Sequence, residues 1–470
     1  MSLKLPDKGQ WAFIGLVMCL VTYYTGSVAV YFLNGKTPLY IWKNFDSMLL
    51  WRIITESNIR TDIRLTAIPS LLSGMVSSLI VPVFIIWQLN KTDVALYGDA
   101  KFASDNDLRK SKLLKWEKEN DTDILVGAYK GKYLWYTAPD FVSLGAGTRA
   151  GKGAAIGIPN LLVRKHSLIA LDPKQELWKI TSKVREILLG NKVYLLDPFN
   201  SKTHQFNPLF YIDLKAESGA KDLLKLIEIL FPSYGMTGAE AHFNNLAGQY
   251  WTGLAKLLHF FINYEPSWLN EFGLKPVFSI GSVVDLYSNI DRELILSKRE
   301  ELEGTNGLDE NALYHLRDAL TKIREYHETE DEQRSSIDGS FRKKMSLFYL
   351  PTVRKCTDGN DFDLRQLRRE DITVYVGVNA EDISLAYGFL NLFFNFVVEV
   401  TLRENPDFDP TLKHDCLMFL DEFPSIGYMP IIKKGSGYIA GFKLKLLTIY
   451  QNISQLNEIY GIEGAKTLMS

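Results

Sequence analysis

Hydrophobic and polar positions divide the chain into three kinds of sequence. Residues 11–33 and 65–89 contain no charged side chain, and each run is long enough to cross a hydrocarbon core of about 30 Å. We therefore expect a membrane domain over residues 1–90, with two transmembrane helices joined by a loop at residues 34–64. A cleaved signal peptide is a weaker interpretation of the first run, because that run is long and a second one follows it.

Beyond residue 90 the pattern predicts a soluble part in which strands and helices alternate. Residues 91–123 are polar and charged, as expected of a membrane-proximal connector. They include a predicted short helix near residues 107–119, capped by Ser104 or Asp105. Two alternating runs at residues 124–129 and 132–137, separated by Lys130-Gly131, predict a β-hairpin. Further β-type runs occur at residues 167–171, 192–196, 372–378, 416–421 and 445–450. Because helix-compatible segments separate several of these runs, we predict an α/β domain with a parallel sheet.

One long stretch interrupts this alternation. From residue 211 to residue 336, apolar side chains recur with a helical period, for example at Leu246, Tyr250 and Leu254. We therefore predict an all-α domain over residues 211–336, inserted into an α/β domain that consists of residues 124–210 and 337–470. The length of 470 residues agrees with more than one domain.

Composition adds three limits to this picture. A hydrophobic fraction of 46% and a formal net charge of −2 are ordinary for a folded protein and do not indicate a polyanion partner. The three cysteines are odd in number and widely separated, which argues against a disulfide framework and for a reducing compartment. The seven histidines show no metal-ligand spacing. We expect His414 to be a packed or surface residue, and we predict no structural zinc.

Residues 141–160 read FVSLGAGTRAGKGAAIGIPN and run from a β-type segment through a Gly-rich turn into a helix-compatible run. This context places a phosphate at a helix N-terminus, and two templates fit it. One is the dinucleotide fingerprint G-x-G-x-x-A at Gly145, Gly147 and Ala150, with Asp172 as the ribose-binding acid. The other is a P-loop ending in Gly151-Lys152, in which Ala146 replaces the first Gly and Gly153 replaces the usual Ser or Thr.

Residues at the ends of two later predicted strands favour the P-loop interpretation. Four apolar residues lead into Asp421-Glu422, the Walker B pattern, in which one acid holds Mg²⁺ through water and the other polarises the attacking water. The next strand ends in Gln451. A triphosphate site uses the P-loop Lys, whereas a dinucleotide site needs no such residue. A membrane-bound NAD(P)-dependent oxidoreductase therefore explains fewer residues than a nucleoside triphosphatase. A non-hydrolysing membrane receptor is a third hypothesis, because the P-loop departs from its template.

Several blocks of sequence resemble the TraG/VirD-type coupling proteins of type IV secretion. The most specific are TRAGKG at residues 148–153 and LDEF at residues 420–423. The resemblance covers nearly the whole chain, and the two predicted spans and the helical insertion agree with it. The other blocks are IALDPKQEL at residues 169–177, FNPL at residues 206–209, DFDLRQL at residues 361–367 and YQ at residues 450–451.

This resemblance implies a membrane-anchored ATPase of RecA-like fold that acts as a homo-hexamer. The protein is expected to be multi-pass in the bacterial inner membrane, with its large ATPase domain in the cytoplasm and the loop at residues 34–64 in the periplasm. Its expected role is to present relaxase–DNA complexes, effector proteins or both to the type IV secretion channel and its inner-membrane components. The resemblance also implies at least one further strand beyond Ser470.

By motif position, the resemblance implies that the site holds ATP and Mg²⁺. Lys152 binds the β- and γ-phosphates, Asp421 holds Mg²⁺ through water, Glu422 activates the attacking water and Gln451 senses the γ-phosphate. Gly153 is usual in this family, although it offers Mg²⁺ no hydroxyl ligand. Thr148 or a water molecule is left to supply that ligand. Asp172 is either an acid near the nucleotide or an ordinary strand end. Backbone amides cradle the phosphates along Gly147, Thr148, Arg149, Ala150, Gly151, Lys152 and Gly153.

Overall fold

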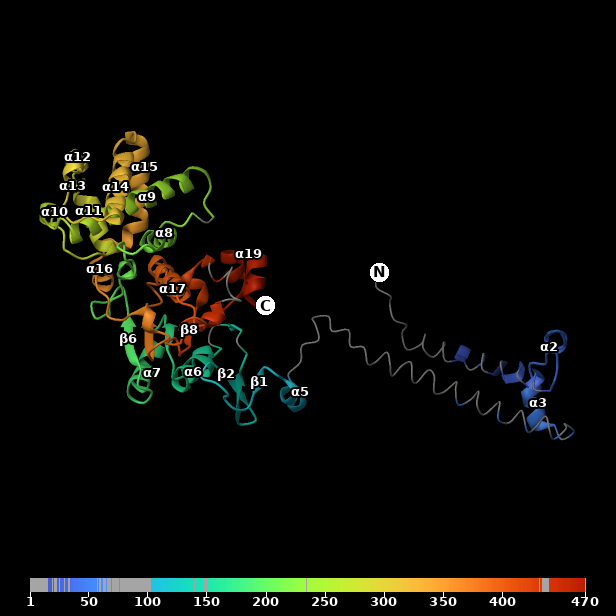
Figure 1. The fold of residues 1–470 in the computed structure, drawn as a ribbon. Coiled ribbons are helices and arrows are strands. Elements are labelled where there is room, and N and C mark those ends of the chain that lie inside the picture. Colours follow the sequence, from blue (N-terminus) through green and yellow to red (C-terminus); the bar gives the residue numbers. More distant parts are fainter. Residues whose placement is uncertain are drawn as a thin grey trace. The chain divides into compact units, whose positions relative to one another are not determined.

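The computed structural model falls into two compact units, Met1–Phe102 and Ala103–Ser470 (Figure 1). Most of the predicted spans, residues 11–33 and 65–89, lies outside the described residues, and the spans stay predictions. In the part of the chain that is described, no helix is both long and apolar enough to cross a membrane. The described residues are 16–18, 20, 23–24, 26–28, 30–32, 34–56, 58, 61, 65, 69, 76, 103–138, 140–147, 150–233, 235–430, 432 and 439–469.

In the first unit, the loop between the predicted spans contains two short helices, α2 (Pro38–Asn44) and α3 (Leu49–Thr55). The Oγ1 atom of Thr37 accepts a hydrogen bond from the backbone N–H of Tyr40 at the start of α2. Pro38 follows this cap at the first helical position, where a missing N–H costs nothing.

The second unit begins with a short helix and a small antiparallel sheet. Helix α5 (Asp105–Lys110) starts at a capping box in which the side chains of Ser104 and Asp107 bond to each other's backbone N–H. The helix predicted near residues 107–119 therefore begins earlier and ends sooner. It stops because Ser111 Oγ accepts the N–H groups of residues 113 and 114 and so turns the chain.

The small sheet has the strand order β1-β3-β2, with β1 at Leu114–Lys115, β2 at Ile124–Tyr129 and β3 at Lys132–Tyr136. Strands β2 and β3 form the predicted hairpin. Its turn residues, Lys130 and Gly131, have φ angles of 49° and 77°, the left-handed pair that a tight two-residue hairpin requires.

A six-stranded sheet, parallel at every pairing, forms the centre of the second unit. Each β-type run predicted beyond residue 160 is a strand of this sheet. The strand order is β4-β9-β8-β5-β7-β6. The strands are β4 (Val142–Gly145), β5 (Leu168–Leu171), β6 (Lys192–Leu196), β7 (Ile372–Val376), β8 (Cys416–Asp421) and β9 (Leu444–Tyr450).

Both faces of this sheet are covered, which explains why its strands read as unbroken apolar runs. In β5, Leu168 and Ala170 pack into one cluster and Ile169 and Leu171 into another, because successive side chains point to opposite faces. The first cluster contains residues of α6 (Ile158–Val163), α7 (Glu176–Ile187) and β2. The second contains residues of α16 (Pro351–Thr357), α17 (Tyr387–Leu402) and α19 (Ile453–Met469).

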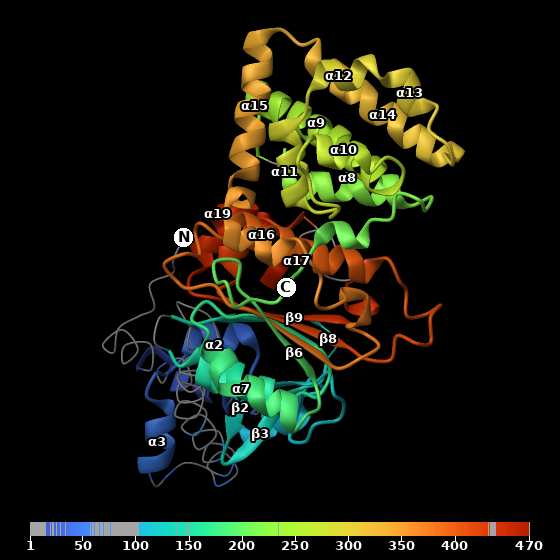
Figure 2. The ribbon, with the colours of Figure 1, turned by 90° about the vertical axis from the view of Figure 1, so that its left-hand side faces the viewer.

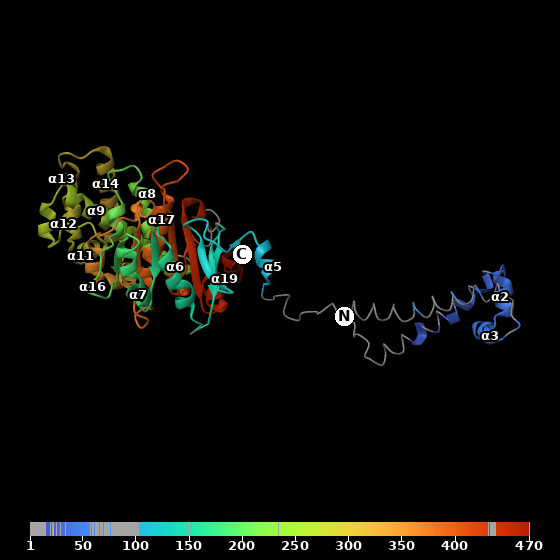
Figure 3. The ribbon, with the colours of Figure 1, turned by 90° about the horizontal axis from the view of Figure 1, so that it is seen from below.

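Between β6 and β7 the chain is helical. The second apolar cluster continues into these helices through Trp251, Leu254 and Leu258 of α9, which are fully buried. Figures 2 and 3 show α9 and α11–α14 gathered on the side of the sheet away from β2 and β3. The helices that precede α16 in this stretch are α8 (Gly219–Leu230), α9 (Gly238–Asn263), α10 (Ser267–Glu271), α11 (Ile280–Asn289), α12 (Arg292–Ser297), α13 (Arg299–Glu303), α14 (Glu310–His327) and α15 (Asp331–Met345).

Candidate nucleotide-binding site

The carboxyl ends of neighbouring strands bring distant polar residues to one edge of the sheet. Strands β4, β9, β8 and β5 lie side by side in this order. Gly145 is paired with Tyr450, Asp421 with Ile449, and Leu171 with Leu420, so the strands end nearly level. The Gly-rich loop, Gln451, Glu422 and Asp172 therefore follow at the same edge, where parallel sheets bind their ligands.

The Gly-rich loop turns directly from β4 into a helix. Gly151 has a φ of 75°, a left-handed conformation that favours glycine. The backbone becomes helical at Lys152 and passes through a π-helical turn, Gly153–Gly157, into α6. A Cβ atom at Gly157 would lie 3.1 Å from Phe419 Cζ, so glycine lets this turn pack closely on the sheet. Thr148 and Arg149, the predicted phosphate-loop residues, lie outside the described part of the chain.

The side chain of Lys152 reaches the acids that follow β8. Its Nζ atom lies 3.6 Å from Glu422 Oε2 and 3.9 Å from Asp421 Oδ1. Gln451 Nε2 donates a hydrogen bond of 2.7 Å to Glu422 Oε2. The structure therefore brings together the four side chains for which the sequence predicted roles in catalysis.

Asp421 is a largely buried acid whose side chain is 23% exposed. Burial raises the pKa of its carboxyl group, and the nearby charge of Glu422 raises it further, while Lys152 opposes both. Its Oδ1 atom is buried and has no hydrogen-bond partner among the described residues. A buried carboxylate oxygen without a donor is uncommon in proteins. Such an oxygen fits the predicted Mg²⁺, since this ion keeps several waters that can donate to a carboxylate.

Glu422 has an unusual backbone. Its φ and ψ are 84° and 53°, a left-handed conformation that costs a non-glycine residue of the order of 1–3 kcal/mol. The backbone N–H and the hydroxyl of Ser425 both donate to the carbonyl oxygen of Glu422, at 2.9 and 2.8 Å, and so hold this turn. The left-handed conformation of Glu422 turns the chain sharply out of β8. Glu422 is also the residue predicted to activate the attacking water.

Asp172 lies beside Asp421 at the end of β5. Burial raises its pKa to about 6, and the charge of Asp421 adds to the rise. Its Oδ2 atom accepts a hydrogen bond of 2.8 Å from the backbone N–H of Trp178 in α7. Asp172 therefore belongs to the same charged edge, although one of its oxygens is committed to α7.

Sequence reasoning assigned no role to Lys174 or Glu176, whose charges act on Asp421. Lys174 lowers the pKa of that carboxyl and Glu176 raises it. The signal was present, because both residues follow directly on the buried strand that ends before Asp172.

The strand order disfavours the dinucleotide interpretation. In the dinucleotide fold, the strand before the Gly-rich loop is central and lies next to the following strand in the chain. Here β4 is an edge strand of the six-stranded sheet, and β9 and β8 separate it from β5. Gly145, Gly147 and Asp172 are therefore not arranged around one crevice of that type.

Comparisons with known proteins agree with this geometry. Residues 101–470 match the family described as Type IV secretory system Conjugative DNA transfer. The conjugal transfer protein TraG of Escherichia coli is 24% identical over 97% of this chain and 73% of its own length. The VirD4 protein of Agrobacterium fabrum is 29% identical over 72% of this chain, which spans only 47% of VirD4.

The fold has a solved counterpart. The bacterial conjugative coupling protein TrwBdeltaN70, in an unbound monoclinic form, is similar with a TM-score of 0.52. The similarity covers 78% of this chain and 73% of that one at 15% identity, and it supports an α/β NTPase fold of the TrwB type. The chain therefore belongs to the type IV secretory system conjugative DNA transfer family and is a coupling protein of the TraG/VirD4 type.

Proposed function

We propose that this coupling protein hydrolyses ATP at the carboxyl edge of its six-stranded sheet. The observation that carries the proposal is the convergence of Lys152, Asp421 and Glu422, with contacts of 3.6 and 3.9 Å across the edge. Backbone amides from Gly147 to Gly153 cradle the phosphates, and Lys152 binds the β- and γ-phosphates. Lys152 also lies close enough to both acids to offset their charge.

Each acid has a separate task in this mechanism. Asp421 would hold Mg²⁺ through water, and a further water would take the place of the hydroxyl that Gly153 lacks. When bound, Mg²⁺ neutralises charge that develops on the phosphates. Glu422 takes the proton of the attacking water. Gln451 senses the γ-phosphate. Because Gln451 also donates a hydrogen bond of 2.7 Å to the Glu422 carboxylate, it links the orientation of that carboxylate to the presence of the phosphate.

The proposed cellular role follows from the family. The spans at residues 11–33 and 65–89 hold the protein in the bacterial inner membrane, with the loop at residues 34–64 in the periplasm. The RecA-like domain, residues 124–210 and 337–470, and the all-α domain, residues 211–336, face the cytoplasm, where ATP is present. As a homo-hexamer, the protein recruits relaxase–DNA complexes, effector proteins or both to the secretion channel. The family description, conjugative DNA transfer, favours the relaxase–DNA cargo.

The test is turnover of Mg²⁺-ATP by the purified full-length chain in detergent. Glu422→Gln is expected to lower kcat by at least about 100-fold while ATP still binds, because only the proton acceptor is lost. Lys152→Ala is expected to lose turnover to a similar degree and to weaken ATP binding. Lys183→Ala, a control at a side chain that is 79% exposed, leaves both unchanged.

Other results would contradict the proposal. ATP binding without turnover by the unsubstituted chain would favour the receptor hypothesis. Binding of NADH without ATP turnover would favour the oxidoreductase hypothesis.

A further inference from the structure

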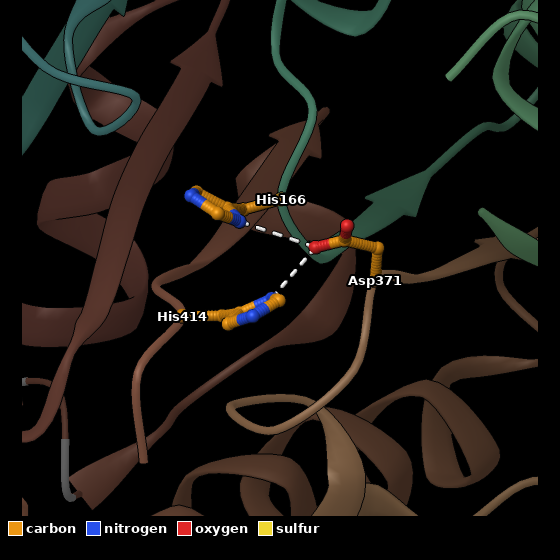
Figure 4. A group of neighbouring side chains, drawn as sticks. All are labelled: His166, Asp371 and His414. Carbon is orange, nitrogen blue, oxygen red and sulfur yellow. Dashed lines mark hydrogen bonds and ion pairs between the residues drawn. The ribbon is translucent and has the colours of Figure 1, made fainter. Parts of the chain in front are cut away.

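A group of two histidines and an aspartate lies at the opposite, amino edge of the same sheet (Figure 4). His166 precedes β5, Asp371 precedes β7 and His414 precedes β8. These strands are neighbours in the order β8-β5-β7, so their amino ends meet. Sequence spacing did not reveal the group, because each member comes from a different strand.

The three side chains converge on one point. Asp371 Oδ1 lies 3.1 Å from His166 Nδ1 and 2.7 Å from His414 Nδ1. Potential ligand atoms of all three residues lie within 4.8 Å of one another. Figure 4 shows both imidazole rings on one side of the carboxylate and directed toward it. The side chains are 17–23% exposed, so solutes can reach them.

Hydrogen bonds next to the ligands hold the loops in place. Ser167 Oγ donates to the carbonyl oxygen of Glu370 at 2.7 Å, and the N–H of Ile372 donates back to Ser167 Oγ at 2.9 Å. These bonds join the residues that flank His166 to the residues that flank Asp371. The backbone N–H of His414 donates to the carbonyl oxygen of Arg368 at 2.9 Å. The donor atoms are therefore presented by anchored segments.

A second carboxylate orients one of the rings. Asp121 Oδ2 lies 3.1 Å from His166 Nε2, the ring nitrogen that does not face Asp371. With zinc bound, a hydrogen bond from the Nε2–H of His166 to Asp121 would leave the Nδ1 lone pair of His166 for the ion. Metal-binding histidines commonly donate their other N–H to a carboxylate in this way.

We propose that His166, Asp371 and His414 bind one Zn²⁺ ion, with a water molecule as the fourth ligand. Two imidazoles and a carboxylate are a donor set that zinc uses. Tetrahedral zinc with bonds of about 2.0–2.2 Å separates its ligand atoms by roughly 3.3 Å. The distances of 3.1 and 2.7 Å from Asp371 Oδ1 to the two Nδ1 atoms are close to this spacing, and all three ligand atoms, which lie within 4.8 Å of one another, adjust to it when the ion binds. The ion joins the loops before β5, β7 and β8. This proposal replaces the expectation of no structural zinc, and it is independent of ATP hydrolysis.

Zinc binding by the full-length chain tests the proposal. The protein is stripped with a chelator, titrated with ZnCl₂ and assayed for bound zinc and for thermal unfolding. One Zn²⁺ per chain is expected, together with a rise of several degrees in the unfolding midpoint. His414→Gln should weaken zinc binding more than 100-fold and lose the thermal shift. Asp121→Asn keeps all three ligands and should weaken binding by about 10–100-fold.

Two controls locate the ion. His242→Gln removes an exposed histidine outside the group, and Asp421→Asn removes an acid of the nucleotide edge; both variants should bind zinc as the unsubstituted chain does. Loading the unsubstituted chain with Co²⁺ in place of Zn²⁺ should give the visible absorption that is typical of tetrahedral Co²⁺. Absence of stoichiometric zinc in the unsubstituted chain, or equal binding by folded His414→Gln, would overturn the proposal and leave a hydrogen-bonded cluster only.

Discussion

At the carboxyl edge of the sheet, Lys152 faces Glu422 and Asp421 at 3.6 and 3.9 Å, longer than hydrogen bonds. At the amino edge, the buried guanidinium of Arg185 makes hydrogen bonds of 2.5–3.0 Å. Its acceptors are the carbonyl oxygens of residues 161, 164 and 166 and the side chains of Asn191 and Thr373. Lys152 is therefore only loosely paired with the two acids, whereas the guanidinium of Arg185 is satisfied within the protein. The contrast is between these two groups, since Arg164, also at the amino edge, has three buried guanidinium nitrogens with no hydrogen-bond partner among the described residues.

This difference follows from what each edge has to do. Groups that bind a substrate must exchange partners with it, so strong internal hydrogen bonds would compete with binding. The buried Asp421 Oδ1, which has no hydrogen-bond partner among the described residues, is such a group. Groups that only hold loops gain stability from every internal bond, because a buried donor or acceptor without a partner costs about 1–3 kcal/mol. Substitutions at the two edges should therefore separate activity from stability.

The largest expected effect is at Arg185. Burial lowers its pKa to about 10, so the guanidinium is charged at neutral pH and depends on its acceptors. Arg185→Met keeps most of the side-chain volume but leaves several buried oxygens without donors. We expect the free energy of unfolding to fall by about 3–5 kcal/mol, measured by chemical denaturation of the full-length chain.

Lys183→Met, on the same helix but 79% exposed, is the matched control and should change stability by less than about 0.5 kcal/mol. The Arg185→Met protein that remains folded should keep its kcat for ATP hydrolysis within about twofold, since Arg185 lies at the opposite edge of the sheet from the nucleotide site. A loss below about 1 kcal/mol would contradict the view that this edge is held by its hydrogen bonds.

The two edges also differ in how far the sequence predicts them. The nucleotide edge was predicted because its residues come in short motifs, such as Gly151-Lys152 and Asp421-Glu422, each at the end of a strand with clear periodicity. Those strands and the hairpin at Lys130-Gly131 depend on local patterns, and the structure confirms them. The strand order decides which strand ends meet, and it depends on packing between distant segments.

The histidine–aspartate group that sequence reasoning missed depends on that long-range order. His166, Asp371 and His414 stand singly in the sequence, and only the adjacency of β8, β5 and β7 brings them together. The left-handed backbone of Glu422 was also missed, because nothing in its residue type favours such a conformation. The short helix α5 begins directly after Ser104, one of its two predicted caps, but it ends at Lys110 because the turn at Ser111 outweighs the broader polar pattern.

A smaller effect is expected from the pH dependence of Asp172. Burial raises its folded-state pKa from an ordinary value of 3.8 to about 6, so the folded chain holds this proton more tightly than the unfolded chain does. The stabilisation is complete below about pH 4 and is lost as pH rises to about 6, amounting to at most about 3 kcal/mol. Asp172→Asn removes this dependence and still accepts the Trp178 N–H. Its stability relative to the unsubstituted chain should therefore rise by up to about 3 kcal/mol between pH 4 and pH 7.

Asp121, at the amino edge, provides a control of opposite sign. The hydrogen bond from Lys118 lowers its pKa, so its contribution to stability is present above the unfolded value and is lost as pH falls. Asp121→Asn should therefore lose stability relative to the unsubstituted chain as pH rises. Equal pH profiles for the two variants would contradict the contrast between the edges.

The smallest expected effect concerns backbone strain, which both edges contain. Glu422 has a φ of 84°, and Lys443, just before β9 at the amino edge, has a φ of 59°. Glycine adopts this conformation freely and alanine does not, so each Gly variant should be more stable than the matching Ala variant by about 1 kcal/mol. Both variants at one position lose the same side chain, and the difference between them therefore reports the backbone alone. ATP turnover should disappear in Glu422→Gly and Glu422→Ala but persist in both Lys443 variants. If Glu422→Gly is no more stable than Glu422→Ala, the left-handed turn after β8 stores no strain, and the aim of the Glu422 carboxylate must be set by Lys152 and Gln451 alone.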